Sequence, residues 1–157
     1  MGCCSSGIPI EPNINKALEI HNQKRKEHGS PPLKINEALN GIAQRFAELL
    51  YKKGIQPEEI FNDEFLGQNI FILKAKIFNV EDMCNSWYEE KNEYGKNPNK
   101  YSKNTSHFTQ MIWKSTTDVG FGFKKMKKGH YYAVAFYYPP GNALGEYKEN
   151  VLLQNSF

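Results

Sequence analysis

The chain has 157 residues and a formal net charge of +3, with 39% hydrophobic and 13% aromatic residues. This length suits one domain, and this share of large apolar side chains excludes a disordered chain. The weak positive charge does not by itself predict nucleic-acid binding. The sequence also contains no run of about 20 apolar residues that could span a membrane as a helix. The sequence therefore predicts one folded domain without a transmembrane helix.

The N-terminal segment differs in composition from the rest of the chain. Residues 1–12 are rich in small residues and proline and show neither helical nor strand periodicity. We therefore predict a flexible tail over 1–12 and place the domain at 13–157. The first helix is predicted over 13–28, where apolar residues recur at helical spacing before a glycine and two prolines end the pattern.

Two further helices follow. Apolar residues at helical spacing predict a helix over 37–53, for which Asn36 is a favourable N-cap. A third helix is predicted over 80–94, with Asn79 as its cap and two acidic residues in its first turn, where the helix dipole favours negative charge.

Strand patterns fill the remainder of the domain. The run over 68–73 is short enough for a strand, and alternating residues over 119–123 lead through a Lys/Gly-rich turn into an aromatic strand that ends at Pro139 and Pro140. The second half therefore predicts an antiparallel hairpin. Helices first and an antiparallel sheet later give an α+β fold in which helices cover the sheet.

Four segments in a fixed order carry a family resemblance. They read HNQKR at 21–25, GQNI at 67–70, HFTQMIW at 107–113 and AFYYPPGN at 135–142. Together they resemble the CAP superfamily, which groups cysteine-rich secretory proteins, antigen-five venom allergens and plant pathogenesis-related proteins. The resemblance is to the intracellular, Golgi-associated branch. It implies a three-layer α-β-α sandwich with a small antiparallel sheet.

The resemblance also implies a cleft. In the family, two histidines and two glutamates converge there and can hold a divalent cation. His107 and Glu90 match two of these positions, whereas Gln68 stands where the family usually has a glutamate, and the segment 54–66 has no histidine. The resemblance thus implies a cleft formed by His107, Glu90 and Gln68, with no firm metal ligand set and no cofactor beyond a weakly bound cation such as zinc.

Glu90 can also be argued from the helical pattern alone. It falls on the same face of the predicted third helix as Met83, Trp87 and Tyr94. A carboxylate on an apolar face needs a partner, because burying an unpaired charge costs several kcal/mol. His107 is the natural partner. Such a pair can be a structural contact, part of a binding cleft or an acid and base, and we favour the structural role.

An enzymatic alternative is a metal-assisted hydrolase or protease centred on Glu90 and His107. The replaced carboxylate and the missing histidine count against it, since zinc sites usually take three or four protein ligands. Cys84 lies inside the third predicted helix and is expected to be a small buried residue rather than a nucleophile. We therefore expect no catalytic residues.

The first six residues, MGCCSS, match a lipidation pattern. Removal of Met1 would expose the amine of Gly2 for myristoylation, Ser6 occupies the preferred position, and Cys3 and Cys4 are adjacent sites for palmitoylation. One acyl chain binds membranes marginally, and a second makes anchoring stable. The alternative is a chance match in a flexible tail.

Lysines crowd the turn of the predicted hairpin. Most such clusters are solvated faces, but near an anionic leaflet each lysine can add about 1 kcal/mol of binding. Further basic residues occur at 24–26. No nucleic-acid-binding module is present. The lysines expected to contact anionic headgroups are Lys124, Lys125, Lys127 and Lys128.

The favoured hypothesis is a lipid-anchored, non-enzymatic protein on the cytosolic face of secretory-pathway membranes such as the Golgi. Because no signal peptide is recognisable, secretion is not expected. Binding to a protein partner and formation of a homodimer are both left open, and nucleic-acid binding is not expected. A second alternative is a carrier that takes a sterol or fatty acid into an apolar groove. Its lining would be Ile60, Phe61, Phe65 and Leu66.

Overall fold

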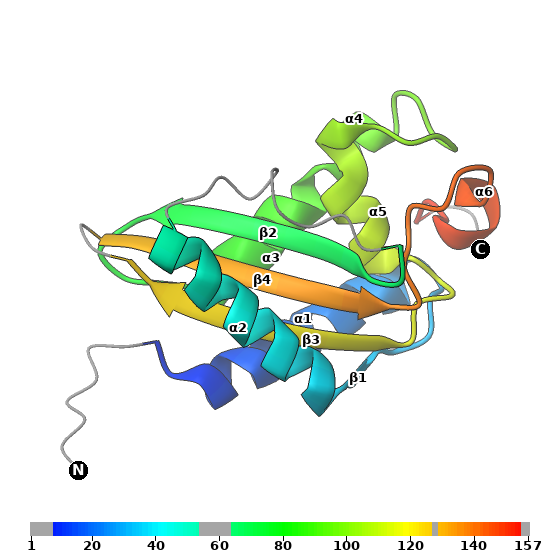
Figure 1. Ribbon diagram of the computed structural model, residues 1–157. Coiled ribbons are helices and arrows are strands. Elements are labelled where there is room, and N and C mark those ends of the chain that lie inside the picture. The colour runs from blue at the N-terminus through cyan, green and yellow to red at the C-terminus, as the bar shows by residue number, and fades with distance from the viewer. Residues whose placement is uncertain (1–7, 54–63, 127–128, 155–157) are drawn as a thin grey trace, which may run out of the picture.

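The computed structural model describes residues 8–53, 64–126 and 129–154, which form a three-layer α-β-α sandwich (Figure 1). One four-stranded sheet has the order β1-β3-β4-β2, and its pairs are antiparallel except for the short parallel pair of β1 with β3. The predicted hairpin is therefore confirmed as β3 and β4. The strands are β1 (Lys34–Ile35), β2 (Gly67–Lys74), β3 (Asp118–Lys125) and β4 (His130–Tyr138).

Helices cover both faces of this sheet. The helix α2 lies across one face, and α1, α3 and α5 lie behind the other (Figure 1). The α+β sandwich expected from the sequence is confirmed. The helices are α1 (Ile10–Glu27), α2 (Glu37–Lys53), α3 (Val80–Glu89), α4 (Lys91–Tyr94), α5 (Ser106–Ile112) and α6 (Tyr147–Asn150), with a short 3₁₀ helix, η2 (Lys103–Thr105), before α5.

Two predicted helix boundaries were wrong. The first helix begins at Ile10, with Pro9 in the extended N-cap position, instead of at residue 13. Pro12 lies in the first turn, where a helix needs no backbone N–H from it, so the prolines that suggested a tail are compatible with a helix start. The third predicted helix is interrupted at Glu90, which separates α3 from α4.

The helix α2 packs directly on the backbone of β3. A Cβ atom at Gly120 would overlap the backbone of α2 at 39–40, and one at Gly122 would overlap it at 43–44. Because both positions are glycine, the helix can approach the strand more closely than any side chain would allow. The alternating phenylalanines of β3 point to the opposite face, toward the larger core cluster.

Side-chain amides from α2 occupy the free edge of β3. The strand β1 pairs with β3 only as far as Val119. Beyond it, Asn40 Oδ1 accepts the Phe121 N–H at 2.9 Å, and Gln44 Oε1 accepts the Phe123 N–H at 2.9 Å. Gln44 Nε2 also donates to the Phe123 carbonyl at 2.8 Å. These amides therefore pair with the edge groups that a further strand would otherwise use.

Arg25 is a fully buried cation at the C-terminal end of α1. Its guanidinium has no carboxylate partner among the described residues and donates instead to backbone carbonyls. Burial lowers the pKa of Arg25 to about 10, so the group stays charged at neutral pH. The sequence predicted a solvated face for the basic residues at 24–26, and this prediction was wrong for Arg25. The accepting carbonyls, 2.8 to 3.2 Å away, belong to Pro31, Met111, Trp113 and Thr116.

Two histidines of α1 and its C-cap are also buried. His21 donates from Nδ1 to the Ala17 carbonyl at 2.8 Å, and its Nε2 lies 2.7 Å from the Tyr137 hydroxyl. A carbonyl only accepts, so Nδ1 carries the proton and Nε2 accepts from the tyrosine. His28 donates similarly to the Leu152 carbonyl at 2.6 Å. Burial lowers the pKa of His21 from 6.5 to about 3 and also lowers the pKa of His28.

The free energy of unfolding should fall as the pH drops below about 6.5. The unfolded chain takes up protons on His21 and His28 from that pH downward, whereas the folded chain resists protonation of His21 until about pH 3. Each histidine can contribute a slope of about 1.4 kcal/mol per pH unit. Urea unfolding at pH 7 and pH 5 measures this loss, and His28→Gln should reduce the slope. Equal stability at both pH values would contradict the assignment.

Candidate functional site

Glu90 and His107 meet at the start of α5. One carboxylate oxygen of Glu90, Oε1, accepts the backbone N–H groups of His107 and Phe108, each at 3.0 Å. The other oxygen, Oε2, accepts from His107 Nδ1 at 2.8 Å. The helix break at Glu90 thus lets a residue between α3 and α4 cap the N-terminal end of α5, where backbone N–H groups lack helical partners. The structure brings together the two residues that the sequence paired.

The hydrogen bonds of this pair limit its chemistry. Both oxygens of Glu90 are already engaged, and Nδ1 of His107 is committed to the carboxylate. Only Nε2 of His107 has no hydrogen-bond partner within the described residues, and its side chain is one-third exposed. The arrangement leaves one imidazole nitrogen of the pair available to a ligand.

A buried polar chain supports the pair from within the core. His107 stacks on the indole of Trp87, with ring centroids 6.0 Å apart. Asn69, on β2, donates from Nδ2 to the His107 carbonyl at 3.1 Å and lies 3.2 Å from the Tyr137 hydroxyl. Tyr137 in turn bonds His21, so α1, β4, β2 and α5 are joined by one set of hydrogen bonds. The sequence analysis did not single out Asn69, although the GQNI segment contains it.

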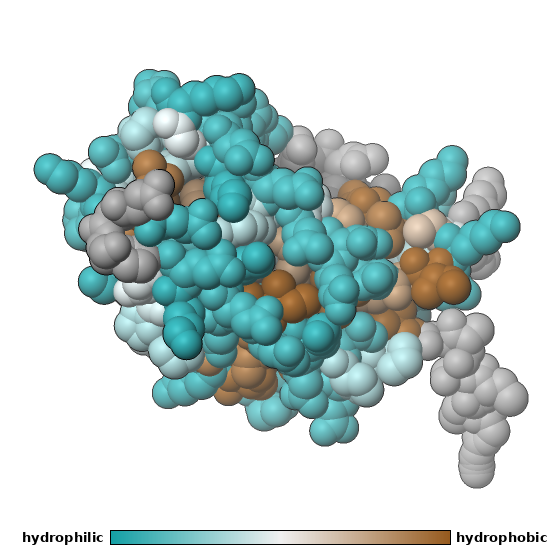
Figure 2. Space-filling view, turned by 180° about the vertical axis from the view of Figure 1, so that it is seen from behind, coloured by the Kyte–Doolittle hydropathy of each residue, from teal (hydrophilic) through white to brown (hydrophobic). Residues whose placement is uncertain are grey.

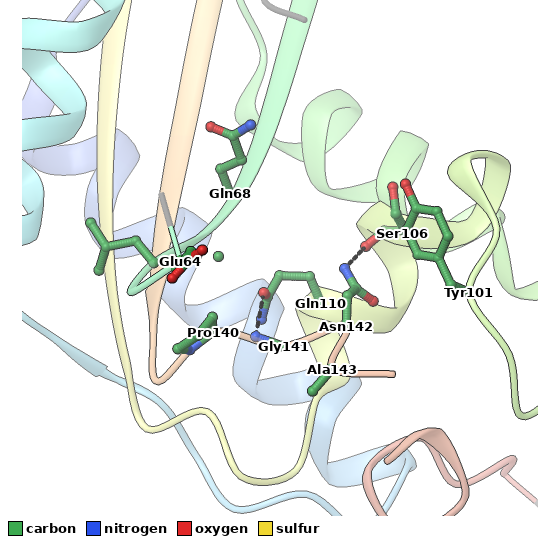
Figure 3. A pocket seen from close by; sticks show the side chains of 11 residues that line it. Glu64, Gln68, Tyr101, Ser106, Gln110, Pro140, Gly141, Asn142 and Ala143 are labelled. Atoms are coloured by element: carbon green, nitrogen blue, oxygen red, sulfur yellow. Dashed lines mark hydrogen bonds between the residues drawn. The ribbon is translucent and has the colours of Figure 1, made fainter. Parts of the chain in front are cut away.

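Gln68, the third predicted cleft residue, points to the opposite face of the sheet from its neighbour Asn69. In the strand register it lies opposite Phe136 of β4, and the side chain of Phe136 belongs to the core cluster under α2. Because paired residues share a face, Gln68 leaves the strand on the α2 side, whereas Asn69 points toward α5. In Figure 3 the Gln68 side chain extends away from Gln110 and Ser106.

A pocket of about 480 Å³ opens between the start of β2, α5 and the segment after β4 (Figure 3). Gln68 lines this pocket, whereas Glu90 and His107 are not among its lining residues. Gln110 forms its floor, because its Oε1 accepts the Gly141 N–H at 2.8 Å and its amide fills the space that a Cβ atom at Gly67 or Gly141 would need. Asn142 donates to the Ser106 carbonyl at 3.0 Å. Several of the polar groups that line the pocket are therefore hydrogen-bonded to one another.

The described residues do not fit a metal centre. In the described ranges no group of three or more His, Cys, Asp or Glu side chains converges that could hold a metal ion. Glu90 and His107 supply two ligands, and the carboxylate is occupied by backbone N–H groups, whereas zinc sites usually need three or four protein ligands. We therefore assign no reaction step to a metal.

Cys84 is fully buried, as the sequence predicted. Its Sγ lies 3.8 Å from His21 Nδ1, a neighbour that the sequence did not reveal. Burial raises the pKa of the Cys84 thiol to about 12, so it stays protonated near neutral pH and is a poor nucleophile.

Several predicted sites lie outside the described residues. They include the lipidation sites Gly2, Cys3 and Cys4, two of the turn lysines, Lys127 and Lys128, and two of the groove residues, Ile60 and Phe61. Of the groove residues inside the described ranges, Phe65 is 75% exposed and Leu66 packs against the core cluster under α2. In the part of the chain that the structure describes, no helix is long and apolar enough to cross a bilayer.

The family follows from a match over most of the chain. A family model for CAP, described as the cysteine-rich secretory protein family, matches residues 18–138. The chain belongs to the CAP family. The match includes the HNQKR, GQNI and HFTQMIW segments that carried the resemblance, together with both partners of the Glu90 and His107 pair.

Similar proteins come from several kinds of organism. The chain is 34% identical over 143 residues to Golgi-associated plant pathogenesis-related protein 1 of Homo sapiens, a match that covers 88% of this chain and 91% of the human protein. It is 32% identical over 146 residues to secreted protein RBT4 of Candida albicans, where it covers 89% of this chain and only 38% of the fungal protein. The CAP domain is thus nearly the whole of the human relative and a minor part of RBT4.

Solved structures confirm the fold. Venom allergen-like protein 4 of Schistosoma mansoni has a TM-score of 0.66 at 25% identity, covering 85% of this chain and 92% of its own. NaASP2, whose structure was solved with Zn²⁺, has a TM-score of 0.68 at 23% identity, covering 92% of this chain and 87% of its own. These similarities place the CAP domain in the α-β-α sandwich fold.

Zinc binding by the native chain should be weak. Isothermal titration with Zn²⁺ should show at most weak binding, which His107→Ala abolishes because it removes the imidazole. Gln68→Glu should not strengthen binding, because residue 68 leaves β2 on the α2 side of the sheet, away from His107. His130→Ala, which changes a histidine of β4 far from the pair in the chain, serves as the control. Tight stoichiometric binding that depends on His107 would contradict the assignment of a mainly structural pair.

Proposed function

We propose that this CAP-domain protein is a lipid-anchored, non-enzymatic protein that binds the cytosolic face of secretory-pathway membranes. Acyl chains on Gly2, Cys3 and Cys4 would hold it to the bilayer, and lysines on the domain would contact anionic headgroups. The name of the human relative, Golgi-associated plant pathogenesis-related protein 1, supports the choice of membrane system.

One structural observation carries the proposal: the N-terminal segment enters the fold at the end that bears the hairpin turn. Ile8 and Pro9 line a small pocket together with Lys76, Ile77 and Tyr131. This places the start of α1 beside the loop after β2 and the first residues of β4. An acylated N-terminus would therefore draw this end of the domain toward the bilayer.

Lysines gather at the same end of the sheet. In the strand register, Lys74 of β2 lies opposite His130, and Lys125 of β3 lies opposite Tyr131. Lys124 Nζ lies 4.9 Å from the centre of the Tyr51 ring, near the C-terminal end of α2. Two strands thus place ammonium groups at the end of the domain where the acyl anchor would start.

The geometry of the cleft supports a non-enzymatic role. Glu90 already accepts three hydrogen bonds from α5, and this makes it a structural cap rather than a group poised to exchange protons. The core hydrogen bonds of Asn69 and Tyr137 fix the position of the same helix. We therefore assign the pair to organising the domain.

Removal of the acyl acceptor should release the protein from membranes. Gly2→Ala should move it to the soluble fraction, because the first acyl chain is lost. Cys3→Ser with Cys4→Ser should leave only weak, exchangeable binding, since a single myristoyl chain binds marginally. Gly7→Ala is the matched control and should stay bound. Cell fractionation and vesicle flotation report the result, and unchanged association in both test variants would refute the anchor.

Neutralising the turn lysines should weaken binding to anionic membranes. The unacylated full-length chain should bind phosphatidylserine-containing vesicles weakly, with binding lost as salt rises, because exposed charges are screened within about 10 Å at 0.1 M salt. Each lysine contributes about 1 kcal/mol, so the quadruple variant should lose most of this binding. The substitutions are Lys124→Gln, Lys125→Gln, Lys127→Gln and Lys128→Gln.

A control variant removes the same charge elsewhere. It should retain more binding than the turn variant if position, and not net charge, decides the contact. Vesicle co-sedimentation at several salt concentrations compares the two. Binding indifferent to salt and to the turn lysines would refute the electrostatic contact. The control substitutions are Lys100→Gln, Lys103→Gln, Lys114→Gln and Lys148→Gln.

A further inference from the structure

The loop between β2 and α3 presents an apolar side chain to solvent. Ile77 is 78% exposed, whereas its neighbour Phe78 packs inward, with ring centroids 5.3 Å from Phe123 and 5.6 Å from Tyr131. Phe78 therefore anchors the loop on the core. Ile77, the residue before it, is left on the outside.

This loop is tied to the start of β4. The Ala75 N–H donates to the Gly129 carbonyl at 3.0 Å, and the Tyr131 hydroxyl donates to the Lys76 carbonyl at 3.0 Å. Both bonds fix the backbone directly before the exposed position, and the packing of Phe78 holds the residue directly after it. Ile77 is thus held outward on an ordered loop, so that little conformational entropy is lost when it enters another phase.

The charged residues nearest to Ile77 in the chain are basic. Lys74 and Lys76 precede it, and the first acidic residue after it is Glu81, in the first turn of α3. Lys125 Nζ lies 6.0 Å from the centre of the Tyr131 ring that supports the loop. Ile8, the first described residue, lines the same pocket of about 170 Å³ as Ile77. Figure 2 shows hydrophobic surface bordered by hydrophilic side chains at this end, which is on the right of the view.

Two other hydrophobic side chains in the described ranges are as exposed as Ile77, and they lie in different surroundings. Leu144 is 83% exposed and stands two residues before Glu146, while Phe65 is 75% exposed and follows Glu64 directly. Single exposed apolar residues are normal on protein surfaces. Ile77 differs from both because it directly follows two closely spaced lysines and lies beside Ile8 and Pro9 of the N-terminal segment.

We infer that Ile77 inserts into the interface of an anionic membrane while the lysines around it contact the headgroups. An apolar side chain flanked by cations matches an anionic bilayer surface, which offers acyl carbon beneath negative charge. The inference rests on the proposed function and adds a specific contact that orients the domain. The hairpin end would face the bilayer, and α6 at the opposite end of the sheet would face the cytosol.

Vesicle binding by the unacylated full-length chain tests the insertion. With vesicles of phosphatidylcholine and phosphatidylserine at 7:3, Ile77→Ser should weaken binding about ten-fold, equivalent to about 1.4 kcal/mol. Leu144→Ser removes an equally exposed side chain at the other end and should bind like the unaltered chain. Equal binding by the Ile77→Ser variant and the unaltered chain would overturn the inference.

Fluorescence provides a measurement that does not depend on affinity. The two native tryptophans, Trp87 and Trp113, are buried, so an added indole at an exposed position gives the responsive emission. Ile77→Trp should shift to shorter wavelength on the same vesicles and be quenched by brominated acyl chains, because the indole enters the interface. Leu144→Trp should show neither effect. Emission of Ile77→Trp that stays at its solvent wavelength while the protein is bound would overturn the inference.

The two proposals fail in different ways. If Gln substitution of the turn lysines abolishes vesicle binding and Ile77→Ser leaves it intact, the electrostatic contact stands and the insertion is wrong. If Ile77→Trp responds to phosphatidylserine vesicles and Gly2→Ala leaves cellular fractionation unchanged, the insertion stands and the acyl anchor is wrong. A chain that binds none of these vesicles, with or without acylation, contradicts both.

Discussion

The buried guanidinium of Arg25 is the contact on which the positions of the other segments depend. Its N–H groups cannot be left without acceptors in the core, because an unpaired buried charge costs several kcal/mol. They are satisfied by carbonyls after α1, at the end of α5 and before β3. One side chain of α1 therefore fixes the C-terminal end of α5. Glu90 fixes the other end of the same helix, so that α5 is held at both termini.

The motifs that identify the family consist largely of residues that stabilise the fold. In HNQKR, His21 bonds Tyr137, Asn22 exchanges two hydrogen bonds with the backbone of Leu33, and Arg25 binds its carbonyls. Each polar side chain of this segment that the structure buries has a structural partner. The resemblance therefore predicts the fold, whereas the function has to be argued from surface residues that lie outside the family motifs.

Local patterns predicted the elements whose cause is local. The β3–β4 hairpin and the Asn36 cap of α2 follow from alternation and from an amide at the helix start, and both are confirmed. The burial of Arg25 could not be predicted, because a charged residue on a helix normally faces water and the acceptors Met111, Trp113 and Thr116 lie more than 80 residues away. The same holds for Glu90, whose helical spacing suggested an apolar face, whereas a distant helix start determines its direction.

The amides of Asn40 and Gln44 have a consequence for assembly. Two copies of a sheet protein can join edge to edge only if each offers backbone groups that are free to pair. On β3 the N–H groups of Phe121 and Phe123 and the carbonyl of Phe123 are already paired with side chains of the molecule's own helix. A second copy therefore cannot extend the sheet by pairing with this part of the β3 edge. A dimer of this domain would have to be built from helical surfaces or from the β2 side, and its symmetry axis would lie away from the β3 edge.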